Sequence, residues 1–169
     1  MHDTLVMAVT DPLTGLYNRR YANNHLESLI IRHQAGGRGL AAMMLDLDRF
    51  KSINDNHGHG AGDEVLCEFA RRLRESVRGI DLVSRIGGEE FLVIMPEDAE
   101  RVAQRVRGAV EEAGFSLKDV ATPLKVTVSI GLAFHRMQEA GGTLIGRADA
   151  ALYASKNRGR NMVTMATAA

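Results

Sequence analysis

The chain has 169 residues, which suits a single domain and is long enough to bury a substantial core without disulfides or structural metals. Its 21 Lys and Arg residues balance its 21 Asp and Glu residues, so the net charge indicates neither a nucleic-acid partner nor a membrane partner. The lone Cys67 cannot form an intramolecular disulfide, and no membrane-length apolar run or secretion signal is present, so a cytoplasmic location is expected.

The N-terminal part of the chain is expected to hold a connector and one helix. Residues 1–10 carry apolar positions without a clear cap and are interpreted as the tail of a connector helix. Asp11-Pro12 is typical of a helix entrance, and apolar residues then recur at roughly helical spacing to about Arg32. We therefore expect one domain over residues 11–169.

A buried strand and an amphipathic helix are predicted next. LAAMMLDLDRF is apolar on both faces up to Asp46, which indicates a strand in the middle of a sheet. FKSINDNHGHGAGDE then interrupts this pattern with polar residues and glycines. Its end, Gly62-Asp63, is expected to open an amphipathic helix with Asp63 as the N-cap.

A hairpin and four more elements, two helices and two strands, complete the pattern. Residues 85–95, RIGGEEFLVIM, are interpreted as two short strands turned around Gly87 and Gly88, where glycine permits positive φ. A helix over residues 96–113, a strand in LKVTVSIGLAF, a helix in TLIGRADAALYASKNRGR and a short strand in MVTM follow. A hairpin among helical crossovers predicts an α/β fold with a mixed sheet.

Four carboxylates are expected to gather at the ends of neighbouring strands. Asp46 and Asp48 end the buried strand, and Glu89 and Glu90 begin the second strand of the hairpin. An unpaired buried charge is costly, so these groups require a partner, and an oxygen-rich cluster suits a hard cation such as Mg²⁺. The alternative from the residues alone is that the acids lie in water at loop ends.

The surroundings of this acidic cluster suit a phosphate group. The glycine pair also allows a ligand to approach the backbone closely, and basic side chains follow both the acidic strand and the last helix. These side chains could alternatively complement a helix dipole. The phosphate-suited residues are Phe50, Lys51, Lys156, Arg158 and Arg160.

Five ordered blocks resemble the GGDEF family of diguanylate cyclases, most closely the output domains of PleD-type response regulators. The blocks are DPLTGLYNRR, DLDRFKSINDNHGHGAGDEVL, RIGGEEF, VSIGLA and RADAALYASKNRGRN. The resemblance implies a five-stranded sheet flanked by helices, similar to class III nucleotidyl cyclases and the polymerase palm. It also implies an N-terminal sensory or receiver domain.

The resemblance implies that two GTP molecules are condensed into cyclic di-GMP with release of pyrophosphate, in a homodimer that holds one GTP per subunit. Two Mg²⁺ ions per active site are implied, with Mn²⁺ as an alternative. The implied metal ligands are Asp46, the Leu47 carbonyl and Glu89, with Glu90 beside the second metal. Glu89 is also the implied base for the attacking hydroxyl, and Lys51 is a second catalytic residue.

The same resemblance assigns a set of substrate-binding residues. Asn54 and Asp63 are assigned to the guanine edge, where a carboxylate can accept from the N1 and N2 donors that adenine lacks. The complete implied set is Phe50, Lys51, Asn54, His59, Asp63, Gly88, Lys156 and Arg160.

A second site involves Arg78 and Asp81, which lie three residues apart. The spacing alone favours an exposed ion pair. The resemblance instead implies a product-inhibition site for cyclic di-GMP, with Arg105 as a secondary contact and Arg85 beside it. Two further functions remain open: a silent module that binds GTP or cyclic di-GMP, and a cyclase that makes a 3′,5′-cyclic mononucleotide.

Overall fold

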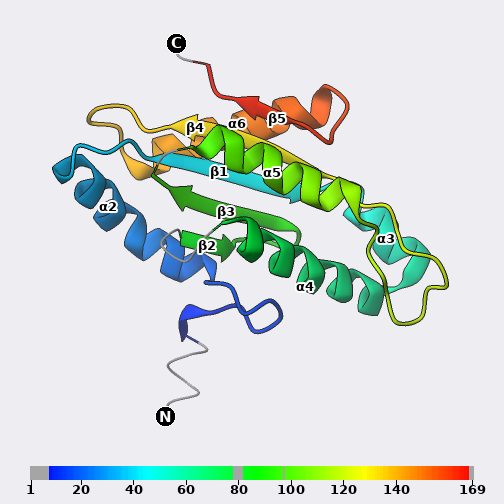
Figure 1. Ribbon diagram of the computed structural model, residues 1–169. Coiled ribbons are helices and arrows are strands. Elements are labelled where there is room, and N and C mark those ends of the chain that lie inside the picture. Colours follow the sequence, from blue (N-terminus) through cyan, green and yellow to red (C-terminus); the bar gives the residue numbers. More distant parts are fainter. Residues whose placement is uncertain (1–7, 78–81, 97, 168–169) are drawn as a thin grey trace.

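The computed structural model describes residues 8–77, 82–96 and 98–167 (Figure 1). Helices are interspersed with strands along the chain, as the α/β prediction requires. The helices are α2 (Arg19–Ala35), α3 (Phe50–His57), α4 (His59–Ser76), α5 (Ala99–Glu112) and α6 (Gly141–Asn157). The strands are β1 (Ala41–Leu47), β2 (Leu82–Arg85), β3 (Glu90–Met95), β4 (Val128–Phe134) and β5 (Val163–Met165).

The strands form one five-stranded sheet in the order β2-β3-β1-β4-β5. The central strand, β1, pairs antiparallel with both β3 and β4, whereas β4 and β5 are parallel. The sheet is therefore mixed, and β1 occupies the central position that its apolar sequence predicted. Figure 1 shows β1 crossing the middle of the molecule between β3 and β4.

Successive residues of β1 point to opposite faces of the sheet and enter two separate hydrophobic clusters. Met43 and Leu45 pack in the cluster that includes residues of α4 and α5. Met44 packs in the cluster that includes residues of α2 and α6. Helix α6 approaches the sheet closely at Gly131 of β4, where an added Cβ would lie 2.1 Å from the Ala148 carbonyl oxygen. The glycine in VSIGLA is thus required by packing.

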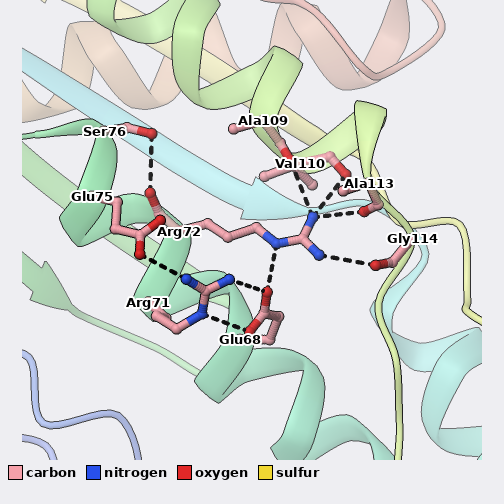
Figure 2. A network of polar contacts seen from close by, with 9 residues as sticks. All are labelled: Glu68, Arg71, Arg72, Glu75, Ser76, Ala109, Val110, Ala113 and Gly114. Atoms are coloured by element: carbon pink, nitrogen blue, oxygen red, sulfur yellow. Dashed lines mark hydrogen bonds and ion pairs between the residues drawn. The ribbon is translucent and has the colours of Figure 1, made fainter.

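Arg72 joins α4 to α5 through a buried guanidinium (Figure 2). Its Nε donates to Glu68 at 2.7 Å, and the guanidinium carbon lies 3.9 Å from the centroid of the Phe115 ring. Its other nitrogens donate to carbonyl oxygens at the end of α5, which lack partners within that helix. These acceptors are Ala109 (3.1 Å), Val110 (3.4 Å), Ala113 (2.7 Å) and Gly114 (3.0 Å).

The predicted start of the first helix is wrong. Helix α2 begins at Arg19, and the Asn18 side chain caps it by accepting from the Tyr21 N–H. Asp11 instead closes a turn, because its carboxylate accepts from both the N–H and the hydroxyl of Thr14 at 2.8 Å. Residues 1–7 of the expected connector lie outside the described residues.

The polar segment before α4 is helical, which the sequence did not indicate. Helix α3 occupies most of it, and Gly58, with φ of 89°, joins α3 directly to α4. Helix α4 consequently begins at His59, and Asp63 lies inside it rather than at its N-cap. None of the described helices is long and apolar enough to cross a membrane.

Candidate active site

The predicted carboxylates meet where β1 ends and β3 begins. The strand register places Asp46 directly opposite Glu90. The Leu47 N–H donates to the Glu89 carbonyl at 3.3 Å, so both glutamates lie next to the last two residues of β1. Side chains opposite each other in an antiparallel pair project from the same face. Asp46 and Glu90 therefore lie on one side of the sheet, and the charge of the adjacent Glu89 also acts on Asp46.

Asp46 is the most perturbed of these carboxylates. Burial is the largest cause of a rise in its pKa to about 6, and the Glu89 and Glu90 charges act in the same direction. Lys156 opposes this shift, with its Nζ 2.9 Å from Asp46 Oδ1. Since burial and neighbouring like charges both disfavour ionisation, an additional cation at Asp46 would relieve both effects.

Asp48 has a different role from the one predicted. Its side chain is 2% exposed, and its oxygens accept from the Ser129 hydroxyl at 2.6 Å, the Thr127 hydroxyl at 2.7 Å and the Asn161 N–H at 3.0 Å. Lys156 Nζ lies 3.1 Å away. Burial raises the pKa of Asp48, but these donors outweigh burial and the pKa is lowered. Asp48 is therefore satisfied by the protein and holds the site together.

The donor set suits a hard divalent cation that also binds substrate phosphates. Within residues 8–77, 82–96 and 98–167, no three His, Cys, Asp or Glu side chains form a group that could hold a metal ion by themselves. Mg²⁺ usually takes one or two protein carboxylates and completes its octahedron with water and phosphate oxygens. Asp46 is a partly buried carboxylate of this kind, and the charges of Glu89 and Glu90 act on it.

The glycine hairpin leaves space for a ligand. Neither Gly87 nor Gly88 has a positive φ, so the turn does not use the conformational freedom that the sequence suggested. A Cβ added at Gly88 would have no described atom within 4 Å, and one at Gly87 would lie 3.5 Å from Glu90 Cβ. Packing therefore does not exclude a side chain at position 88, and the backbone there is open to close approach.

Arg85 supports this hairpin, a role that the sequence did not reveal. Its Nε donates to the Gly87 carbonyl at 3.1 Å and to the Gly88 carbonyl at 3.0 Å, and its Nη2 donates to the Gly88 carbonyl at 2.9 Å. The guanidinium thus fixes the loop that leads to Glu89.

The predicted guanine-binding residues lie at the junction of α3 and α4. Asn54 Oδ1 is buried and has no hydrogen-bond partner among the described residues. It lies so close to Gly62 that an added Cβ there would be 1.9 Å away, and Phe50 Cζ would be 3.1 Å from the same Cβ. Asp63 follows Gly62 and is exposed on α4, whose first residue is His59. An orphan amide oxygen beside an exposed carboxylate suits a base edge with several N–H donors.

The basic residues come from two parts of the chain, the start of α3 and the end of α6. Lys51 is exposed in the first turn of α3, an end that no described side chain caps. Lys156 contacts Asp46 and Asp48, and Arg160 precedes Asn161, whose N–H is bound by Asp48. Arg158 instead lines a groove of about 410 Å³ between α6 and β5, so it does not join the other cations.

The predicted inhibition site is only partly described. Arg78 and Asp81 lie outside the described residues. Arg105 is exposed on α5 and donates to the Ser76 carbonyl at the end of α4. Arg105 therefore lies next to the helix end that precedes Arg78 in the chain.

The comparisons with known proteins show the family of the chain. The family described as "Diguanylate cyclase, GGDEF domain" matches residues 8–162. The response regulator PleD of Caulobacter vibrioides is 47% identical over 165 residues, which cover 95% of this chain. That match spans 36% of PleD, so the chain corresponds to about a third of the length of this relative.

Solved structures show the same fold. The GGDEF domain of DgcB from Caulobacter crescentus, in complex with c-di-GMP, has a TM-score of 0.90 and 36% identity, over 95% of this chain and 94% of that one. The active GGEEF domain of a diguanylate cyclase from Vibrio cholerae has a TM-score of 0.82 and 27% identity, over 90% and 98% respectively. The chain therefore belongs to the GGDEF domain family of diguanylate cyclases.

Proposed function

We propose that this domain is an active diguanylate cyclase that condenses two GTP molecules into cyclic di-GMP and releases two pyrophosphates. The observation that carries the proposal is the convergence of Asp46, Glu89 and Glu90 at one end of the sheet, where burial and mutual repulsion raise the pKa of Asp46 to about 6. The relatives named diguanylate cyclase support the assignment, as does the Vibrio cholerae GGEEF domain, which has the same Glu at the third position.

Asp46, the Leu47 carbonyl and Glu89 are proposed to hold Mg²⁺ or Mn²⁺, with Glu90 beside a second ion. Bound Mg²⁺ would supply charge neutralisation and orientation of the phosphates. The proposed base is Glu89, which takes the proton from the 3′-hydroxyl as that oxygen attacks the α-phosphorus of the other GTP and pyrophosphate leaves. Because each bond joins two nucleotides, two subunits must face each other, with one GTP in each.

The guanine base and the triphosphate are assigned to separate groups of residues. Asn54 and Asp63 accept from the guanine N–H groups, beside Phe50 and His59. Lys51, Lys156 and Arg160 balance the charge of the triphosphate, and Gly88 allows the backbone to come close to it. The orphan Asn54 oxygen and the open space at Gly88 support this placement.

Product inhibition is proposed to act at Arg78, Asp81 and Arg105. The position of Arg105 beside the end of α4 supports this proposal, and the DgcB domain was solved with c-di-GMP. Bound product would keep the two half-sites from meeting.

Incubation with GTP and Mg²⁺, followed by chromatography of the products and a pyrophosphate assay, tests the proposal. We expect cyclic di-GMP with two pyrophosphates per product, and a specific activity that rises with protein concentration as dimers form. Binding of GTP without pyrophosphate at high protein concentration would identify a silent module. A 3′,5′-cyclic mononucleotide would identify a different cyclase.

A further inference from the structure

The turn from α6 to β5 has an unusual backbone. Gly159, Arg160 and Asn161 have φ angles of 122°, 67° and 49°, so three successive residues have positive φ. A left-handed conformation is unfavourable for a non-glycine residue, and it persists where its surroundings enforce it. Arg160 is one of the proposed phosphate-binding residues, so whatever enforces this turn also places that side chain.

Asn161 is held in this turn by hydrogen bonds from both its main chain and its side chain. Its backbone N–H donates to Asp48 Oδ2 at 3.0 Å. Its side-chain amide donates through Nδ2 to Glu111 Oε2 and accepts at Oδ1 from Arg107 Nη1 at 3.2 Å. Arg107 and Glu111 form an ion pair of 3.1 Å on α5, one helical turn apart. Both the Oδ1 and the Nδ2 of the Asn161 side chain are thus hydrogen-bonded to α5, and its main-chain N–H is hydrogen-bonded to Asp48, which follows β1.

Asp48, which accepts from the Asn161 N–H, is itself buried and hydrogen-bonded. Asp48 is held by the Ser129 and Thr127 hydroxyls of the β4 segment, and it shares Lys156 with Asp46. A continuous set of polar contacts therefore runs from α5 through Asn161 and Asp48 to Lys156. We call Arg107, Glu111, Asn161 and Asp48 the Asn161 frame. The frame holds the turn that carries Arg160, and its member Asp48 also contacts Lys156.

We propose that Arg107, Glu111 and Asn161 are positioning residues for the triphosphate, acting through Arg160 and through Asp48 on Lys156. This inference rests on the proposed function, since it concerns the phosphate end of the same GTP site. Arg107 and Glu111 touch Asn161 rather than the carboxylates of the site, so their effect on binding must pass through the turn. A purely structural role, tying α5 to the sheet, would instead change stability and affect every ligand equally.

The test compares ligands that do and do not carry phosphates. In Glu111→Ala, the Kd of a nonhydrolysable GTP analogue should rise about fivefold, the typical effect of losing one hydrogen bond, while the Kd of guanosine stays unchanged. Asn161→Gly should behave likewise, because glycine tolerates the φ of 49° but removes both side-chain contacts. Glu111→Gln keeps an acceptor for the Asn161 amide and should remain close to the wild type.

Glu112→Ala is the matched control, since Glu112 is exposed next to Glu111 on α5 and forms no hydrogen bond or ion pair with Arg107, Asn161 or Asp48 in the described part of the chain. Thermal unfolding of each variant shows that the fold is intact. The positioning role is refuted if folded Glu111→Ala and Asn161→Gly bind the GTP analogue as the wild type does. It is also refuted if the Kd of guanosine rises in these variants by the same factor as the Kd of the GTP analogue. A wild-type protein that does not bind the GTP analogue would refute the proposed function, and this inference with it.

Discussion

Arg85 forms an ion pair with Asp11, with Nη1 3.2 Å from Oδ2 and the two side chains 18% and 17% exposed. The same guanidinium holds the Gly87 and Gly88 carbonyls. Asp11 also closes the turn that contains Thr14, so the N-terminal turn is linked to the hairpin that carries Glu89, the proposed base. The sequence positions joined in this way are 74 residues apart.

A double-mutant cycle measures this link. Arg85→Ala should destabilise the domain more than Asp11→Ala, because it also leaves the hairpin carbonyls without a donor. The coupling free energy in urea denaturation should be about 0.5–1 kcal/mol, as for a well-oriented pair with little exposure. Additive effects of the two substitutions would show that the pair does not connect the turn to the hairpin.

The raised pKa of Asp46 predicts a pH-dependent stability of the metal-free protein. Burial, with the nearby glutamates, favours the protonated form in the folded state. The associated stability is therefore present below the unfolded pKa of 3.8 and is lost as the pH rises through about 6. Between pH 4 and pH 7, Asp46→Asn should gain on the order of 1–3 kcal/mol relative to the wild type. Urea denaturation in EDTA measures the difference, and a constant difference would contradict the assigned environment.

The same substitution should remove activity. Asn keeps the shape of Asp46 but not its negative charge, so turnover with Mg²⁺ should fall by about a hundredfold or more. Calorimetric binding of Mg²⁺ with a nonhydrolysable GTP analogue should weaken in parallel. If turnover survives, the metal site lies elsewhere.

Strand β1 and the hairpin could be predicted because the pattern of their residues reflects their own burial. The apolar run to Asp46 predicted a central strand, and the RIGGEEF segment predicted a turn with acids at the start of the next strand. Both predictions depend on neighbours in sequence. The proximity of Asp46 and Glu90 follows from these two predictions, because Asp46 lies near the end of one strand and Glu90 begins its neighbour.

Contacts between distant segments could not be predicted in this way. Helix α3 was missed because its glycine-flanked polar sequence has few apolar residues, although Phe50 anchors it in the core. Asp48 was grouped with the other carboxylates of the acidic cluster because nothing local shows that Asn161, 113 residues away, donates to it. The N-cap role predicted for Asp63 failed because His59 and Gly58 extend the helix backwards.

Arg72 and Arg71 provide a matched pair for stability (Figure 2). Arg72→Met removes the donor for four carbonyls at the end of α5 and should cost about 2–4 kcal/mol of unfolding free energy. Arg71 contacts the same Glu68 but is 52% exposed, so Arg71→Met should cost less than about 1 kcal/mol. Equal effects of the two substitutions in urea denaturation would mean that the carbonyl contacts contribute little.

The guanine assignment predicts a change in nucleotide preference. Inosine triphosphate lacks the N2 amino group of GTP, so an acceptor for that group should favour GTP over it. The Kd of Asp63→Ala for GTP should therefore rise by about tenfold or more, and this variant should lose most of the preference for GTP over inosine triphosphate. Asp55→Ala, which removes an exposed carboxylate of α3, should retain that preference because Asp55 is assigned no contact with the base. Competition binding with both nucleotides measures the ratio. If Asp63→Ala discriminates as the wild type does, the base edge is read by other residues, and the buried Asn54 oxygen becomes the next candidate.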